Sequence, residues 1–255
     1  MNSTIDDVTR SRITDVYGHV PDVLADGLKR CIDQSNPPST PDELWDHRDV
    51  VMITYADQIR ESGKSPLDAQ RQFLLDHNLD ELIRCVHLLP FCPSTSDDGF
   101  SVADYLAVDP ESGDWDDIKR LGERFDLMYD LVLNHSSQQH RWFQGFLNDE
   151  PEYKDFYTTA DPSEDLSEVV RPRSLPLLTE FDSASGKRHV WTTFSADQVD
   201  LNYANPRVML AMLETLVEYA RRGARIIRLD AIAFLWKEIG TSCLHLPQTH
   251  AAVRL

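Results

Sequence analysis

Cysteine is scarce in this sequence of 255 residues, and the few that occur form no recognisable motif. Cys31, Cys85, Cys92 and Cys243 include no CxxC pair, and they are too few for a disulfide-stabilised scaffold. The N-terminal residues also lack the basic stretch followed by an apolar stretch that a secretory signal requires. These absences favour a cytoplasmic protein.

Basic residues and long apolar runs are also in short supply. Lysine and arginine number 25 against 43 aspartate and glutamate residues, which gives a formal net charge of −18. A surface of this sign repels the phosphates of nucleic acids and of anionic lipids. The longest apolar runs are strand-sized and fall well below the roughly 18 residues of a membrane span. We therefore expect neither a nucleic acid nor a membrane as a partner.

The chain does contain an alternation of short apolar runs with helical patterns. Hydrophobic residues make up 41% of the sequence, which is enough for a sizeable core. Strands are predicted at 50–54, 84–89, 127–133 and 225–229, and helices at 65–77, 115–125 and 207–222. Such alternation indicates an α/β fold with right-handed crossovers and a parallel sheet. The length permits a (β/α)8 barrel.

The segments outside this alternation suggest the domain organisation. Two amphipathic helices are predicted before the first strand, from apolar residues at helical spacing: Ile5, Val8, Ile13 and Val16, then Val23, Leu24, Leu28 and Ile32. The proline-rich stretch 35–41 separates these helices from the first predicted strand. We expect residues 1–49 to form a helical extension on the outside of a larger domain. Residues 140–205, rich in proline, aromatic and charged side chains, are expected to form an inserted subdomain.

Polar side chains gather where three of the predicted strands end. In a parallel sheet flanked by helices, ligands bind at the carboxyl ends of the strands. The residues in question are Asp97, Asp130, Asn134, His135, Arg228 and Asp230. A single Asp at a strand end is more often the cap of the next helix than a catalyst, and Asp130 with Asn134 and His135 could be a buried hydrogen-bonding cluster. Three such groups at successive strand ends favour a site that binds a sugar.

The alternation of strand side chains sharpens this hypothesis. Arg228 and Asp230 are two residues apart and should share a face, as should Asp130 and Asn134. A neighbouring cation favours the ionised form of a carboxyl group. Asp230 is therefore suited to act as a nucleophile.

Three short segments resemble the signature regions of the α-amylase superfamily. They are DLVLNH at 130–135, QVDLN at 198–202 and GARIIRLD at 223–230. Longer segments resemble the sucrose phosphorylase group of glycoside hydrolase family 13: VVMITYADQI at 50–59, VHLLPFCPSTSDDGFSVADY at 86–105, VRPRSLPLL at 170–178, VWTTFSADQVDLN at 190–202 and KEIGTSC at 237–243. The helical extension, DDGFSVADY and WTTFSADQVDLNYANP are most similar to the glucosylglycerate phosphorylase branch, and Val170 stands where sucrose phosphorylases carry tyrosine.

The resemblance implies a fold and a set of residues that bind the glucosyl group. The fold would be the N-terminal half of a (β/α)8 TIM barrel with a long insertion after the third strand, the partial barrel comprising residues 50–139 and 206–255 and the insertion residues 140–205. Asp230 would be the nucleophile and Arg228 would orient it. Asp97 and His135 would hydrogen-bond the sugar hydroxyls, and Phe100 would face the ring.

The same resemblance implies roles around the acceptor. Phe194 would line the cavity, and Gln198 would lie in the acceptor region. Arg173 would approach the acceptor or phosphate, a role that suits a guanidinium. Asp130 would support His135, with Asn134 beside it.

The activity implied is retaining transfer of an α-glucosyl group to phosphate, which gives α-glucose 1-phosphate from sucrose or a related glucoside such as glucosylglycerate. The expected partners are a small glucoside and inorganic phosphate, with a homodimer possible, and no cofactor or metal is expected. An amylosucrase-like or α-glucosidase-like enzyme and an inert fragment remain alternatives.

The resemblance also implies that the chain stops early. The acid/base glutamate would lie beyond Leu255, because Glu238, the sole acidic side chain after Asp230, falls in a loop segment. The sequence is therefore expected to be a truncated form that is inactive alone.

Overall fold

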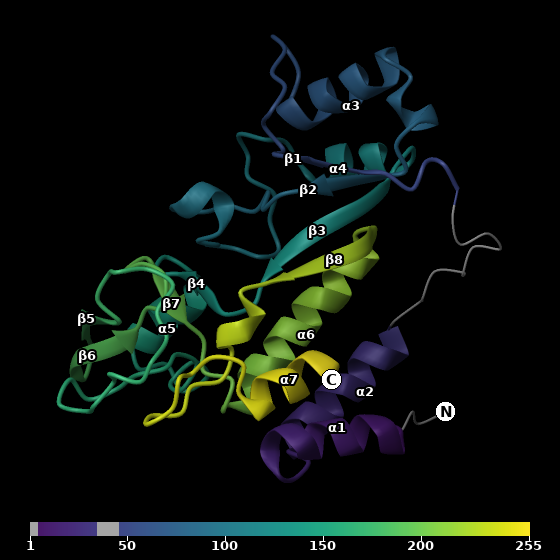
Figure 1. The fold of residues 1–255 in the computed structure, drawn as a ribbon. Helices are drawn as coiled ribbons and strands as arrows, with labels where there is room; N and C mark the ends of the chain where they lie inside the picture. Colours follow the sequence, from purple (N-terminus) through teal and green to yellow (C-terminus); the bar gives the residue numbers. More distant parts are fainter. Residues whose placement is uncertain (1–4, 35–45) are drawn as a thin grey trace. The chain divides into compact units, whose positions relative to one another are not determined.

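The computed structural model describes residues 5–34 and 46–255, which gather into two compact units (Figure 1). One unit comprises Met1–Gln34, Val132–Glu214 and Asp230–Leu255, and the other Ser35–Leu131 and Thr215–Leu229. The predicted proline-rich separator at 35–41 lies outside the described residues. None of the described helices is long and apolar enough to cross a membrane.

The unit that comprises Ser35–Leu131 and Thr215–Leu229 is built on a four-stranded sheet in the order β1-β2-β3-β8. The strands are β1 (Val51–Thr54), β2 (Cys85–Leu88), β3 (Asp126–Val132) and β8 (Ala224–Asp230), the last residues of β3 and β8 belonging to the other unit. β1 pairs with β2, and β2 with β3, in parallel register. Helices α3 (Pro66–Asp76) and α4 (Trp115–Gly122) form the connections, with a short 3-10 turn, η1 (Leu79–Glu81). The predicted strands, helices and parallel sheet are confirmed.

Local chemistry explains where these two helices begin. Ser65 caps α3 by accepting a hydrogen bond from the Asp68 amide at 3.2 Å, and Pro66 occupies the first turn, where its missing N–H costs nothing. Asp114 and Asp117 form a capping box at the start of α4. The helices bury one apolar face each against the strands, and the shared core contains Leu67, Leu74, Val86, Leu88, Ile118, Leu121, Leu127, Tyr129 and Leu131.

The other unit contains the two predicted N-terminal helices, α1 (Asp7–Tyr17) and α2 (Asp22–Gln34). α1 packs against α7 (Pro247–Arg254), and Gly27 of α2 lies so close to Leu210 of α6 (Pro206–Arg221) that no larger side chain would fit without movement. Ile13 and Leu24 are buried, whereas Val8 is 57% exposed. The helical periodicity thus identified both helices, but not every apolar residue in them faces the core.

Residues 140–205 contain a helix and short strands, and the last of these strands pairs with a strand just before residue 140. The antiparallel hairpin of β5 (Leu178–Ser183) and β6 (Gly186–Trp191) lies beside α5 (Arg141–Leu147), and the short strands β4 (His135–Ser137) and β7 (Gln198–Asp200) pair antiparallel. Aromatic rings fill the space under the hairpin: Phe143, Phe146, Tyr157 and Phe181. The same compact unit holds the N-terminal helices and residues after Asp230, and the domain boundaries drawn from the sequence stay a prediction.

His140 makes the stability of this unit depend on pH. The residue is 4% exposed, and its Nδ1 accepts a hydrogen bond from the Trp142 amide at the start of α5. Burial, aided by the neighbouring Arg141 cation, lowers the pKa of His140 to about 3. An unfolded histidine has a pKa of about 6.5, so below that pH the unfolded chain binds the proton and the folded chain does not.

We therefore expect the free energy of unfolding to fall by about 2 kcal/mol on this account between pH 7 and pH 5. Urea unfolding at several pH values measures the slope. His140→Asn keeps a capping side chain but cannot titrate, and it should have a flatter pH dependence than the wild type. Equal slopes in the two proteins would show that His140 is not the group responsible.

Candidate active site

Strand β8 carries two of the predicted site residues at its carboxyl end. Arg228 and Asp230 are separated by one residue, so the alternation of a strand places them on the same face. The next residue, Ala231, has a left-handed φ of 54°, which is uncommon for a residue other than glycine. The chain then enters a 3-10 turn, η3 (Ile232–Phe234). Asp230 is therefore the last residue of the strand, separated from this turn by Ala231 alone.

Arg228 is held by a buried carboxylate from the neighbouring strand. Asp130 of β3 accepts a hydrogen bond from Nη1 of Arg228 with one oxygen, and its other oxygen lies 2.6 Å from Nε2 of His87 on β2. The Asp130 side chain is completely buried. Three adjacent strands are thereby joined at their carboxyl ends. The bonds of Asp130 go to His87 and Arg228, and its proposed support of His135 stays a prediction.

Asp97 and Phe100 lie in a tight turn after β2. Three consecutive residues of the 3-10 turn η2 (Asp97–Gly99) have positive φ, with values of 56°, 51° and 96°. A Cβ atom on Gly99 would lie 2.7 Å from the carbonyl oxygen of Pro90, so glycine is needed there. The Phe100 ring centre lies 5.9 Å from the Arg228 guanidinium carbon, within the range of a cation–π contact. The turn therefore places the Phe100 ring against the Arg228 guanidinium. Both residues belong to the same unit.

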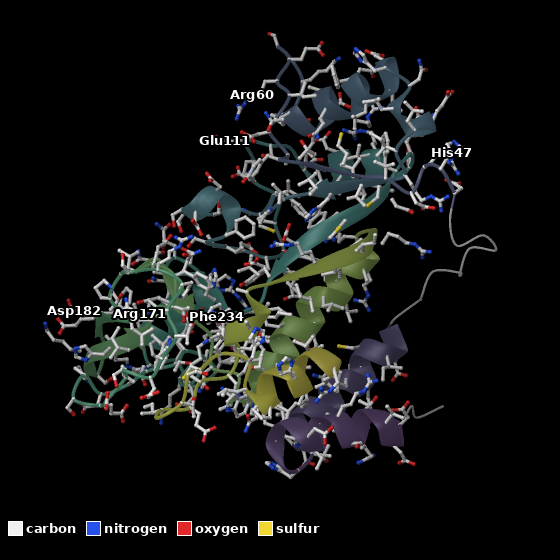
Figure 2. All side chains as sticks on the ribbon, in the orientation of Figure 1. His47, Arg60, Glu111, Arg171, Asp182 and Phe234 are labelled. Carbon is white, nitrogen blue, oxygen red and sulfur yellow. The ribbon has the colours of Figure 1, made fainter. Side chains whose placement is uncertain are left out.

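Four other predicted residues come together in the unit that contains Val132–Glu214. Nε2 of Gln198 lies 3.2 Å from Nε2 of His135 across the β4–β7 pair, and both residues are 1% exposed. The Phe194 ring lies 5.1 Å from the His135 ring, and the Arg173 guanidinium lies 6.0 Å from Phe194. Phe234, the last residue of η3, also packs on Phe194 at 5.3 Å (labelled in Figure 2). An imidazole, an amide, an aromatic ring and a guanidinium thus converge, a combination that can bind sugar hydroxyls and an anion.

The loop that carries Arg173 is fixed at both ends and exposed between them. The Val170 amide donates to the Ser242 carbonyl at 2.9 Å, and the Thr192 amide donates to the Leu177 carbonyl at 2.7 Å. Val169 and Leu177 are buried with Trp191 and Cys243. The exposed residues between them include both arginines of the RPR segment, so the loop presents two cations from a rigid base.

Asn134 lies beside His135, with its Nδ2 3.4 Å from Nδ1 of that ring, but it is not related to Asp130 by strand alternation. Strand β3 ends at Val132, so the alternation that relates it to Asp130 does not extend to Asn134. Its amide instead donates to Asp200 at 2.9 Å and accepts from the Lys237 ammonium at 2.7 Å. Reasoning from the sequence missed Asp200 and Lys237, as well as His87. For His87 the available signal was a polar residue inside the apolar stretch CVHLL, whereas Lys237 comes at the end of the apolar run AFLWK.

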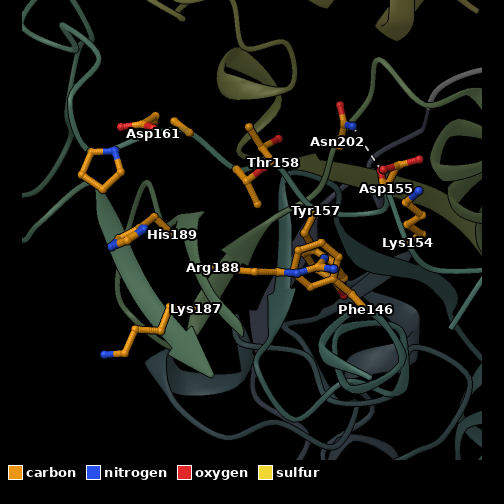
Figure 3. Close-up of a pocket in the computed structure, with 13 residues that line it drawn as sticks. Phe146, Lys154, Asp155, Tyr157, Thr158, Asp161, Lys187, Arg188, His189 and Asn202 are labelled. Carbon is orange, nitrogen blue, oxygen red and sulfur yellow. Dashed lines mark hydrogen bonds between the residues drawn. The ribbon is translucent and has the colours of Figure 1, made fainter. Parts of the chain in front are cut away.

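A cavity of about 630 Å³ opens elsewhere in this unit, beside β6 (Figure 3). None of the predicted site residues lines it. Arg188 pairs with Asp149 and lies over the Phe146 ring at 4.3 Å, and Lys187 pairs with Glu180. The two cations that β6 contributes to the lining of this cavity, Lys187 and Arg188, are therefore already paired with carboxylates. Across the described part of the chain, no group of three or more histidine, cysteine, aspartate or glutamate side chains could hold a metal ion.

Comparison with known proteins gives a consistent picture. The family model "Alpha amylase, catalytic domain" matches residues 79–250. The chain is 57% identical over 223 residues to the glucosylglycerate phosphorylase of Spirochaeta thermophila, covering 85% of this chain and 38% of that protein. It is 51% identical to the enzyme of the same name from Escherichia coli, covering 83% and 38%, and 33% identical to a sucrose phosphorylase of Streptococcus mutans, covering 76% and 41%.

Among solved structures, the chain is similar to sucrose 6F-phosphate phosphorylase from Thermoanaerobacter thermosaccharolyticum. The TM-score is 0.74 at 30% identity, covering 83% of this chain and 45% of that one. These likenesses confirm the expected fold class, a partial (β/α)8 barrel, and the resemblance to the phosphorylases. The chain spans about 38% of the length of the first curated relatives it matches.

Proposed function

The chain belongs to the α-amylase family, and from this premise we propose that the whole protein transfers an α-glucosyl group from a small glucoside to phosphate. The observation that carries the proposal is the identity of 51% to 57% with three glucosylglycerate phosphorylases along more than four fifths of this chain. The polar groups at the ends of β2, β3 and β8 support it, because sites of barrel enzymes lie at the carboxyl ends of the strands.

The proposed reaction is a double displacement with net retention of configuration. The Asp230 carboxylate attacks the anomeric carbon, the bond to the leaving oxygen breaks, and a β-glucosyl ester forms. The leaving oxygen takes a proton from a second carboxyl group, which we place in the part of the relatives' length that this chain does not span. A phosphate oxygen then attacks the anomeric carbon, the bond to Asp230 breaks, and the proton of the phosphate passes to the second carboxyl group, which gives α-glucose 1-phosphate. Glu238 is exposed on a loop, which does not suit it to be the acid.

The remaining residues are proposed to bind and orient the substrates. Arg228, fixed by Asp130, would orient Asp230 two residues further along the strand. Asp97 and His135 would hydrogen-bond the glucosyl hydroxyls, and Phe100 would face the ring. On the acceptor side, the group of His135, Phe194, Gln198 and Arg173 supports the roles assigned to the last three.

Arg173 provides a direct test of phosphate as the acceptor. In the full-length protein, we expect Arg173→Ala to raise the KM for phosphate by about 10-fold to 100-fold, because a charged hydrogen bond contributes about 1.5–3 kcal/mol. Initial rates of glucose 1-phosphate formation at varied phosphate concentration measure this. Arg171→Ala is the matched control, since Arg171 lies in the same exposed loop and has no hydrogen bond or ion pair within the described residues (labelled in Figure 2).

The outcome also separates this proposal from other acceptors. An unchanged phosphate dependence in Arg173→Ala would rule out its proposed contact. Release of free glucose without glucose 1-phosphate from the wild type would favour an α-glucosidase-like activity, and transfer to a second sugar would favour an amylosucrase-like one. We propose glucosylglycerate as the glucoside, and comparison of initial rates with glucosylglycerate and sucrose tests that choice.

We further propose a cytoplasmic location and a homodimer. All four cysteines are buried thiols, which is consistent with a reducing compartment. Light scattering of the full-length protein tests the oligomeric state. That the enzyme needs no metal ion stays a prediction. Activity that survives a chelator would support it.

A further inference from the structure

Lys237 places an ammonium group in the interior of the unit that holds the acceptor residues. Its side chain is 5% exposed, and Nζ donates to Oδ1 of Asn134 at 2.7 Å and to Oδ2 of Asp200 at 2.8 Å. Burial lowers the pKa of Lys237, and the neighbouring Asp200 carboxylate opposes that shift. An ammonium group removed from water in this way needs such partners to remain charged.

Asp200 is the centre of this network. Its carboxylate is fully buried and also accepts bonds from the Asn134 amide at 2.9 Å, the Thr193 backbone amide at 2.9 Å and the Thr193 hydroxyl at 2.6 Å. With the ammonium of Lys237, both carboxylate oxygens are satisfied. The four side chains come from four separate stretches of sequence, which the network ties together.

Three members of the network lie close in the chain to residues of the proposed site. Asn134 precedes His135, and Thr193 precedes Phe194. Asp200 is paired with His135 across the β4–β7 ladder and lies two residues from Gln198 on β7. The network itself therefore holds the backbone from which these three side chains project.

Lys237 also fixes the segment that comes after the proposed nucleophile. Phe234 lies three residues before Lys237, and its ring packs edge-on against Phe194. Phe194 in turn contacts the His135 ring. The segment from Asp230 to Lys237 is thus anchored at its far end by an ammonium group bound to the same strands that carry His135 and Gln198.

We propose that Lys237 is a positioning residue for the glucosyl transfer: through Asp200 and Asn134 it sets the placement of His135, Gln198 and Phe194. This inference rests on the proposed function. A purely structural role is less consistent with the chemistry, because a buried ion pair adds little net stability and can often be replaced by apolar groups. What an ion pair with several directed contacts does provide is a single arrangement of the segments it joins.

The test uses two variants of Lys237 and one control. Lys237→Met removes the ammonium and leaves the Asp200 carboxylate buried without its cation, so it is expected to unfold more easily. The double variant Lys237→Met/Asp200→Asn removes both charges together and should recover most of the thermal stability. Lys154→Met is the matched control, an exposed lysine of the same unit that has no ion pair within the described residues (Figure 3).

The first measurement needs no enzymatic activity. Histidine side-chain NMR of the 255-residue chain should show a changed His135 resonance in the double variant and an unchanged one in Lys154→Met. Unaltered His135 signals in a folded double variant would overturn the inference. Because this measurement does not depend on turnover, it separates a failure of the inference from a failure of the proposed function.

The second measurement is phosphorolysis by the full-length protein. The double variant should have a kcat about 100-fold below the wild type at a temperature where both are folded, since a misplacement of about 1 Å can cost this much. A merely structural role predicts that kcat returns together with thermal stability. A kcat within about twofold of the wild type would therefore refute a positioning role, whereas an inactive wild type would refute the proposed function alone.

Discussion

Replacing Asp230 by asparagine in the full-length protein is expected to abolish glucosyl transfer, with a loss of several orders of magnitude in kcat. An amide nitrogen or neutral amide oxygen cannot form the glycosyl ester on which the double displacement depends. The substitution keeps the shape of the side chain at the end of β8, so folding should be nearly unchanged. Initial rates of glucose 1-phosphate formation measure the loss, and thermal unfolding verifies the fold.

Two further variants define what this loss means. Glu238→Gln is the matched control, because Glu238 is the sole acidic side chain after Asp230 and is exposed. It should keep near-normal turnover, and a severe loss there would require Glu238 to be considered as the acid. His135→Ala should cost less than Asp230→Asn, because it removes a hydroxyl contact and leaves the nucleophile. Near-normal turnover in Asp230→Asn would mean that the nucleophile lies elsewhere.

The regular part of the fold could be predicted because it depends on local patterns. The strands at the centre of the sheet are short apolar runs, and α3 and α4 begin at residues that cap helices in most contexts. The hairpin β5–β6 was missed because charged residues on its exposed face obscure the alternation. Its turn was marked by Gly186, which has a φ of 116°, but a single glycine is a weak signal inside a polar stretch.

The site was predictable only in part, because its contacts join residues that are far apart in the sequence. The resemblance identified Arg228 and Asp130 individually, yet their direct bond spans 98 positions. Asp200 and Lys237 look in the sequence like a strand-end carboxylate and a solvated lysine. Their pairing becomes visible only when both side chains are seen to be buried against Asn134. Periodicity reports which face a residue lies on, but it carries no information about which distant charge will meet it.

Asp130→Asn is expected to have the second large effect, because three strands depend on one carboxylate. Asp130 accepts from Arg228 with one oxygen and contacts His87 with the other. Arginine can only donate hydrogen bonds, so the oxygen of an asparagine must face Arg228. The NH2 group then faces Nε2 of His87, which must change from donor to acceptor or lose the bond.

We expect Asp130→Asn to lower the free energy of unfolding by about 1–3 kcal/mol, the cost of leaving a buried polar group poorly paired. In the full-length protein kcat should also fall, because Arg228, which is 42% exposed, exchanges its bond to a carboxylate for a weaker bond to a neutral amide oxygen. Asp126→Asn is the control, because Asp126 lies on the same strand and its side chain has no hydrogen bond or ion pair in the described residues. It should change the free energy of unfolding by less than about 0.5 kcal/mol. Urea unfolding and initial rates measure the two effects separately. If Asp130→Asn matched Asp126→Asn in both, the His87–Asp130–Arg228 contact would be incidental, and Arg228 would need another explanation for its fixed position on the strand.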